Sequence, residues 1–192
     1  MSGHGFHVHG PHDHEVENAA QHGDKDRFAG SIAVMTAILA TIGALFSYMG
    51  GATQANAGLY KNNAAIKKTE AGNQWNYYQA KSGKQNLAEL ALVLVADERK
   101  PAFEKEIERY KAEKAEIKLA AEKLEAESRA WDEQSEAQLH LHHRWAQATT
   151  ALQVSIALAA ITLLTRRKGM AYGMYGVAAV GVVLGGLAFA HL

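Results

Sequence analysis

The sequence predicts an all-α membrane protein, with three transmembrane helices and a long antiparallel helical coiled-coil hairpin between the first and second. Two observations support this fold class. Three long stretches of the 192-residue chain contain no Asp, Glu, Lys or Arg, and about 20 apolar residues at 1.5 Å each cross a ~30 Å hydrocarbon core. Between the first two stretches the chain becomes rich in Glu and Lys and repeats its apolar residues at heptad spacing, which is typical of a coiled coil.

Composition excludes several classes of protein. Lys and Arg together number 20, as do Asp and Glu, so the balance of charge gives no reason to expect a nucleic-acid partner. The chain has no cysteine, which excludes disulfides, thiolate metal sites and cysteine nucleophiles. Phosphate loops, nucleophile elbows and dinucleotide fingerprints are absent from the sequence as well. We therefore do not expect an enzyme.

The predicted elements follow one another along the chain as six segments. They are a His-rich tail (1–27), a first span (28–49), the extramembrane hairpin (50–144), a second span (145–165), a basic turn (166–168) and a third span (169–190). Three buried core helices are the alternative, but a chain this small has little polar surface to cover them. A cleaved signal peptide is the alternative for the first span, which is longer than a typical signal core.

The tail concentrates the histidines, with six of the ten in the first 22 residues. The candidate metal ligands are His4, His7, His9, His12 and His14. Imidazole binds zinc, copper and nickel, but this tail lacks a defined ligand spacing such as His-Glu-x-x-His. We interpret it as a flexible, solvated tail without a tightly bound cofactor, and weak binding of zinc, copper or nickel is the alternative.

The hairpin is predicted from two heptad seams, one in each half. The seam of the second half is mostly apolar, with polar interruptions at Lys114, Ser128 and Ser135. Its members alternate at steps of four and three: Phe103, Ile107, Tyr110, Lys114, Ile117, Ala121, Leu124, Ser128, Trp131 and Ser135. In the first half the predicted seam is weaker and polar in its middle: Leu59, Asn62, Ile66, Thr69, Asn73, Asn76, Ala80, Gly83, Leu87, Leu90 and Leu94. Two helices splayed into separate oligomeric coils are the alternative.

A turn between the halves is expected near residues 96–101. Pro101 is suited to the first turn of a helix and disfavours helix in the residue before it. Position 97 is also the midpoint between Met49 and Trp145, where the two flanking spans end and begin. Two helices of equal length would thus leave and return to the same face of the membrane.

The third span contains two pairs of glycines at the spacing that allows membrane helices to approach closely. These pairs are Gly169-x-x-x-Gly173 and Gly181-x-x-x-Gly185. At about 100° per residue they point some 120° apart, so we expect them to contact different neighbours, either the other spans or a second copy of the chain. Ordinary glycine richness of a membrane helix is the alternative.

The distribution of cations predicts the orientation. Lys25 and Arg27 precede the first span, and Arg166, Arg167 and Lys168 form the turn between the second and third. Because short cytoplasmic loops are enriched in Lys and Arg, we expect the N-terminus and this turn in the cytoplasm. The hairpin and the C-terminus would then lie in the periplasm of a Gram-negative cell.

Residues 73–82 (NQWNYYQAKS) combine aromatic and amide side chains in a way that is unusual for a solvated helix. Together with the His-rich head and the three spans, this block resembles a bacterial inner-membrane family catalogued as domain-of-unknown-function family 4337. The resemblance covers nearly the whole chain. It implies a bacterial inner-membrane protein with a helical extramembrane portion, and it implies no activity.

The same block has two interpretations. Aromatic and amide residues suit a partner surface, which would be formed by Asn73, Trp75, Asn76, Tyr77 and Tyr78. The alternative is a seam of the hairpin itself, in which the two asparagines fix the register against residues 118–125.

Polar groups inside the spans are hydroxyls and amides, apart from His191 at the very end. Proton relays and ion-coupled pumps usually need ionisable groups there. Thr36, Thr41, Thr149 and Gln153 are the candidates for lining a pore between several copies. Outside the spans, Asp132, Glu136, His140 and His143 recur at helical spacing, and a charged juxtamembrane face is favoured over a cation site there.

These features favour a non-enzymatic inner-membrane scaffold or accessory subunit. It would self-associate as a homo-oligomer in membrane lipid and use its hairpin for assembly or for contact with another membrane complex. An oligomeric channel is the alternative function, and a metal-responsive protein working through the tail is a weaker one.

Overall fold

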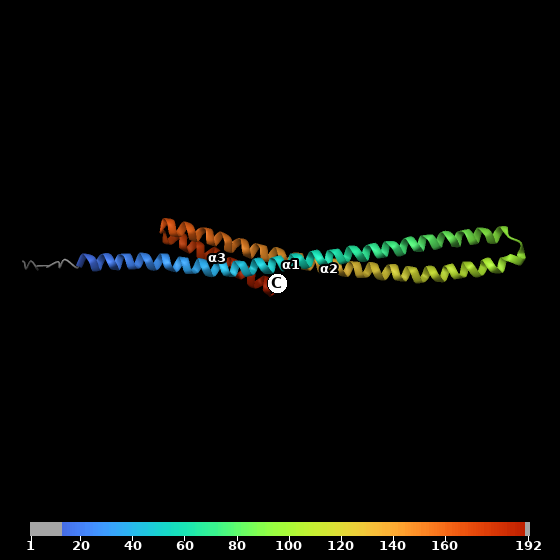
Figure 1. The fold of residues 1–192 in the computed structure, drawn as a ribbon, viewed down its shortest axis with the longest axis horizontal. Helices are drawn as coiled ribbons and strands as arrows, with labels where there is room; N and C mark the ends of the chain where they lie inside the picture. Colours follow the sequence, from blue (N-terminus) through green and yellow to red (C-terminus); the bar gives the residue numbers. More distant parts are fainter. Residues whose placement is uncertain (1–12, 191–192) are drawn as a thin grey trace, which may run out of the picture. The chain divides into compact units, whose positions relative to one another are not determined.

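The computed structural model describes residues 13–190 of the chain, with side chains from residue 27 onward. These residues form three α-helices joined by two short connections (Figure 1). Helix α1 spans Asp13–Leu94, α2 spans Lys100–Thr165 and α3 spans Lys168–Phe189, with a short 3₁₀ helix, η1, at Asp97–Arg99. All three α-helices contain a stretch long and apolar enough to cross a membrane.

Helix lengths follow from where helix-breaking residues occur. The chain has two prolines; Pro11 precedes α1 and Pro101 lies in the first turn of α2, where proline is tolerated because the first amides of a helix have no partner within it. Helix α1 continues through Gly50 and Gly51 without a break. It also begins at Asp13, so the helix takes in the second half of the segment predicted as a His-rich tail, because helix propagates readily from a stable span.

The described chain divides into two compact units. The three-helix unit contains the residues up to Gly50 and from His143 onward, and the two-helix unit contains Gly51–His142. Helices α1 and α2 each contribute to both units.

Within the two-helix unit, α1 and α2 pack together. Helix α2 uses the predicted seam: Ile107, Ile117, Ala121, Ser128 and Ser135 are buried, and Phe103, Tyr110, Lys114, Leu124 and Trp131 are half-buried. The largest apolar side chains of this seam are thus buried or half-buried. The prediction for this helix is therefore confirmed.

Helix α1 uses a different seam from the predicted one. Every residue of the predicted seam is exposed. The buried residues are instead Thr53, Ala57, Ala64, Ala71 and Ala88. Small residues face α2 because α2 already supplies large ones, and layers of large against small side chains fill the space between two helices.

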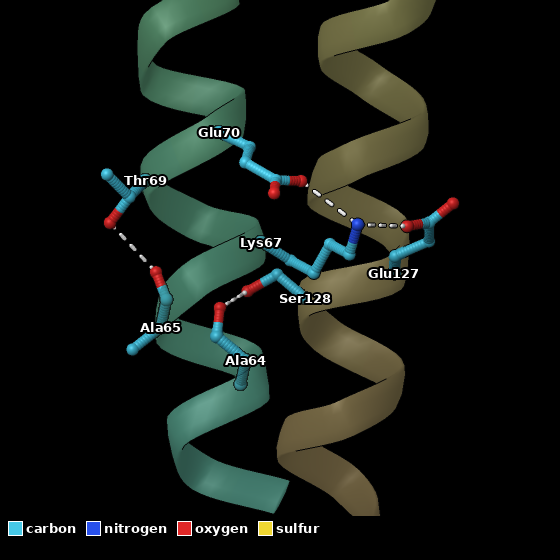
Figure 2. A network of polar contacts seen from close by, with 7 residues as sticks. All are labelled: Ala64, Ala65, Lys67, Thr69, Glu70, Glu127 and Ser128. Carbon is cyan, nitrogen blue, oxygen red and sulfur yellow. Dashed lines mark hydrogen bonds and ion pairs between the residues drawn. The ribbon is translucent and has the colours of Figure 1, made fainter.

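Two hydrogen bonds reinforce this close approach. The hydroxyls of Ser128 and Ser135 donate to the backbone carbonyls of Ala64 and Ala57, at 2.8 and 2.9 Å. Figure 2 shows the Ser128 contact beside Lys67 of α1, whose ammonium lies 2.9 Å from Glu70 and 3.4 Å from Glu127 of α2. A serine side chain reaches the neighbouring backbone only because alanine leaves it accessible.

The three-helix unit has a core drawn from all three helices. Ile32 of α1, Ala159 of α2 and Met174 of α3 pack in one buried cluster, and Leu39, Leu152 and Ala178 form a second. The Ser155 hydroxyl donates to the backbone carbonyl of Met174 at 2.8 Å. Phe46 and Trp145 pack with ring centroids 5.2 Å apart.

Candidate interaction surface

The most distinctive surface of the two-helix unit is the exposed heptad face of α1. We call it the α1 stripe and define it by these residues: Leu59, Asn62, Ile66, Thr69, Asn73, Asn76, Ala80, Gly83, Leu87, Leu90 and Leu94. Its largest apolar side chains are more than half exposed at Leu59 (55%), Leu87 (68%), Leu90 (59%) and Leu94 (76%). Exposed apolar side chains repeated along one helix face indicate a contact surface.

The spacing of the stripe is that of a second coiled-coil seam. Its members alternate at steps of three and four residues along the whole first half of the two-helix unit. Such a pattern buries one face of a helix against another helix. Because α2 occupies the alanine seam of α1, the stripe is left without a covering helix among the described residues.

The aromatic block divides between the two faces. Trp75 and Tyr78 are half-buried and pack edge to face at 5.7 Å. The Trp75 indole donates to Glu125 of α2 at 3.1 Å, and the Lys114 ammonium lies 4.9 Å from the centre of the Tyr78 ring. These two residues thus contact α2 and do not form an outward surface.

Asn73, Asn76 and Tyr77 are exposed. The alternative in which the asparagines set the register against residues 118–125 is therefore wrong, because they lie on the stripe face of α1. Trp75 makes the contact with that region of α2 instead.

An ion pair that sequence reasoning missed joins Lys81 of this block to α2. The Lys81 ammonium is 2.6 Å from the Glu113 carboxylate and lies 5.2 and 5.6 Å from the ring centres of Tyr77 and Tyr110. The Lys81 ammonium beside it holds the pKa of Glu113 below its ordinary value. The same ion pair raises the pKa of Lys81.

These shifts predict how the stability of the two-helix unit depends on pH. The lowered Glu113 pKa stabilises the folded state above the ordinary value of about 4.5, and this contribution is lost as the pH falls through the folded pKa. The Lys81 contribution is present below about 10.5 and is lost as the pH rises above it. We expect Glu113→Gln to flatten the acid side of a urea-unfolding midpoint plotted against pH. Glu116→Gln, at an exposed position of the same helix, should leave that profile unchanged, and equal profiles for the two variants would contradict the assignment.

The four glycines of the third span serve different surfaces. A Cβ at Gly181 would lie 2.9 Å from Leu152 and 3.2 Å from the carbonyl of Ala148, and one at Gly185 would overlap the Phe46 ring. This pair packs against α1 and α2 of the same chain. At Gly169 and Gly173 a Cβ would meet nothing within 4 Å, so these two positions remain available to a neighbour.

The four candidates for lining a pore differ in burial and in their hydrogen bonds. The hydroxyls of Thr36 and Thr41 donate to carbonyls of their own helix, Ile32 and Ala37. The Thr149 hydroxyl is buried and makes no hydrogen bond with a described residue, and Gln153 is exposed. Two of the four candidates thus have their hydroxyls bonded within their own helix, and only Gln153 has an exposed polar group without a hydrogen bond among the described residues.

Metal ligands are not brought together in the described residues, where no group of three or more His, Asp or Glu side chains could hold an ion. Asp132 pairs with Lys61 at 2.6 Å. His4, His7, His9 and His12 lie outside the described residues, and the side chain of His14 is not described.

The signal that would have located the buried seam of α1 is present in the sequence. Ala57, Ala64 and Ala71 are spaced seven residues apart, as are Ser128 and Ser135 on the partner helix. Small residues at matched spacing on two helices indicate close backbone approach, and this signal competes with the more conspicuous leucines of the stripe.

The comparisons with known proteins identify a family of unknown function. The family described as a domain of unknown function (DUF4337) matches residues 28–191. No curated protein and no solved structure matches the chain. The matched region takes in the apolar stretches of all three helices and the whole two-helix unit, and the chain therefore belongs to the DUF4337 family.

Proposed function

We propose that this protein is a non-enzymatic membrane scaffold that self-associates through the α1 stripe. In this proposal the three-helix unit lies in the bacterial inner membrane, and the two-helix unit is an antiparallel coiled-coil hairpin in the periplasm. Three apolar helices support the membrane location. The N-terminus and the turn between α2 and α3 are then cytoplasmic.

The orientation is supported by where the cations of the three-helix unit lie. Arg27 precedes Phe28, and Phe28 and Leu163 pack against the same buried cluster. Arg166, Arg167 and Lys168 follow directly after α2. Four exposed cations thus lie at one end of this unit, and the positive-inside rule assigns that end to the cytoplasm.

The antiparallel arrangement of the hairpin is supported by the order of its contacts. Ala57 pairs with Ser135, Ala64 with Ser128, and Lys81 with Glu113. Positions in α2 decrease as positions in α1 increase. A short connection at residues 95–99 is compatible with helices that reverse direction.

The α1 stripe is the observation that carries the proposal, and a second copy of the chain is its occupant. Copies inserted in one membrane share one orientation, so their α1 helices run parallel. Asn73 then meets Asn73 of the next copy in the polar middle of the seam, and a paired asparagine at a seam position fixes the register of parallel coiled coils. Amide groups donate and accept equally, so the stripe complements itself.

The test introduces a charge into the stripe. Leu87→Glu places a carboxylate at a leucine that is 68% exposed, and Leu119→Glu does the same at a leucine of α2 that is 67% exposed but lies outside the stripe. Loss of a buried leucine weakens association by about 1.5–3 kcal/mol, or roughly 10- to 100-fold. We expect native mass spectrometry of protein released gently from its membranes to show a homo-oligomer that Leu87→Glu dissociates and Leu119→Glu retains.

Two outcomes would overturn the proposal. An unchanged oligomer in Leu87→Glu would remove the stripe from the interface. A mixed complex that Leu87→Glu dissolves would make another protein the occupant and the chain an accessory subunit. Circular dichroism of both variants verifies that each remains helical.

A further inference from the structure

Gln153 is a polar side chain without a partner inside an apolar helical segment. It lies on α2 within residues 145–165, its side chain is exposed, and it makes no hydrogen bond with a described residue. Most other polar side chains of the apolar segments donate to backbone carbonyls of their own unit: Ser31, Thr36, Thr41, Thr150, Ser155, Thr162 and Thr165. Gln153 is therefore a polar group whose hydrogen bonds must be made elsewhere.

In lipid this arrangement is costly. An amide without hydrogen bonds in an apolar medium costs about 2–7 kcal/mol, and lipid tails offer neither donors nor acceptors. A glutamine toward the interior of a membrane span is stable when another helix presents a polar group at the same depth. This requirement indicates a partner helix and sets what the partner must carry.

The residues around Gln153 allow a helix to approach. Ala146, Thr150, Ala157 and Ala160 are exposed on the same side of α2. With Gln153 they are spaced at alternating steps of four and three residues, which is the spacing of a coiled-coil seam. Four small side chains let two backbones come close enough for an amide to reach across.

We propose that α2 pairs with α2 of a second copy inside the membrane, through a two-fold contact centred on Gln153. Copies with one orientation present the same residue at the same depth, so Gln153 meets Gln153. Each amide donates through its nitrogen and accepts through its oxygen, and the two side chains satisfy one another. This inference rests on the proposed self-association and adds a second interface, in the three-helix unit.

Single cysteines test the contact, because the chain contains no cysteine of its own. Ala157→Cys lies one turn from Gln153, and Ala37→Cys is an exposed control on α1. The two cysteines lie at matched depths in the membrane. Met35 lies near Ala37, Ile156 lies next to Ala157, and both pack against the same buried cluster. After mild oxidation of intact membranes, we expect at least about tenfold more disulfide-linked dimer for Ala157→Cys than for Ala37→Cys.

The role of the amide is tested by adding a second change to Ala157→Cys. An interhelical hydrogen bond in a membrane is worth about 0.6–2 kcal/mol, so Gln153→Leu should reduce crosslinking by about three- to thirtyfold. Gln153→Asn keeps an amide and should retain most of the crosslinking. Equal crosslinking at both cysteines, or crosslinking that is insensitive to Gln153→Leu, would overturn the contact.

The crosslinking and mass-spectrometry results together distinguish a failure of this intramembrane contact from a failure of the proposed function. An oligomer that depends on Leu87, in a protein whose Ala157→Cys variant does not crosslink, would overturn the intramembrane contact and leave the scaffold proposal intact. Crosslinking at Ala157→Cys that requires Gln153, together with an oligomer insensitive to Leu87→Glu, would support the contact and remove the stripe from assembly.

Discussion

Replacing Ala64 by leucine is expected to lower the free energy of unfolding of the two-helix unit by about 1–3 kcal/mol through overpacking. Ala64 is 5% exposed and faces α2. A leucine there separates the helices and draws its own carbonyl away from the Ser128 hydroxyl, which donates to it at 2.8 Å. Loss of that hydrogen bond adds about 0.5–1.5 kcal/mol.

The neighbouring residue provides the matched control. Ala65 is exposed on the same turn of α1 (Figure 2), and leucine and alanine have similar helix propensities, so Ala65→Leu should change stability by less than about 0.5 kcal/mol. Urea unfolding of the protein in detergent measures the free energy of unfolding of both variants. Hydrogen exchange of the amides near residues 64 and 128 monitors the transition. Similar destabilisation by the two variants would contradict the alanine seam.

A substitution at Ile66, which belongs to the α1 stripe, distinguishes the stripe from the buried face of α1. Its side chain is 47% exposed, so truncation leaves no cavity between α1 and α2. Ile66→Ala should therefore be nearly neutral in the unfolding experiment, whereas a buried isoleucine truncated to alanine costs about 2–5 kcal/mol. The same substitution should weaken association, because the stripe is proposed to act between copies.

Gly185→Ala should destabilise the three-helix unit by about 1–3 kcal/mol, since overpacking forces neighbours from their positions. The added methyl would overlap the Phe46 ring. That ring cannot move freely, because it packs against Trp145 at 5.2 Å between centroids. A change in the tryptophan fluorescence emission should accompany the lower thermal unfolding midpoint in detergent.

Gly186→Ala is the control for this prediction. A Cβ at Gly186 would meet nothing within 4 Å, and alanine favours helix over glycine by up to about 1 kcal/mol. The midpoint should stay the same or rise. Equal losses at Gly185 and Gly186 would show that α3 tolerates no side chain at this end for reasons other than the Phe46 contact.

The buried face of α2 is predicted correctly from the sequence, whereas that of α1 is predicted wrongly, because the two helices differ in where their large apolar side chains lie. In α2 the large apolar side chains and the buried face coincide, so Ile107, Ile117 and Trp131 were correctly placed on the seam. In α1 two faces carry heptad spacing, and the rule that prefers larger apolar residues selected the face with Leu59, Ile66 and Leu87. The buried face is the one with alanines.

The candidate contact residues divide in the same way. Tyr77 and the two asparagines could be recognised as unusual for a solvated helix, and they are exposed. The ion pair between Lys81 and Glu113 could not be recognised, because it joins residues far apart in the chain whose proximity depends on the register of α1 against α2. Gln153 can be recognised in the sequence as a polar residue in a span, but its lack of a hydrogen-bond partner is evident only once the positions of α1 and α3 are known.

The sequence by itself determined two local features of this protein: the break before Pro101 and the three apolar stretches. Each depends on residues close together in the chain, through proline geometry or hydropathy. Only the tertiary structure decided which face of α1 is buried against α2 and which is left exposed. The reason is steric complementarity, because the bulky seam of α2 and its two serine hydroxyls fit against alanine and not against leucine.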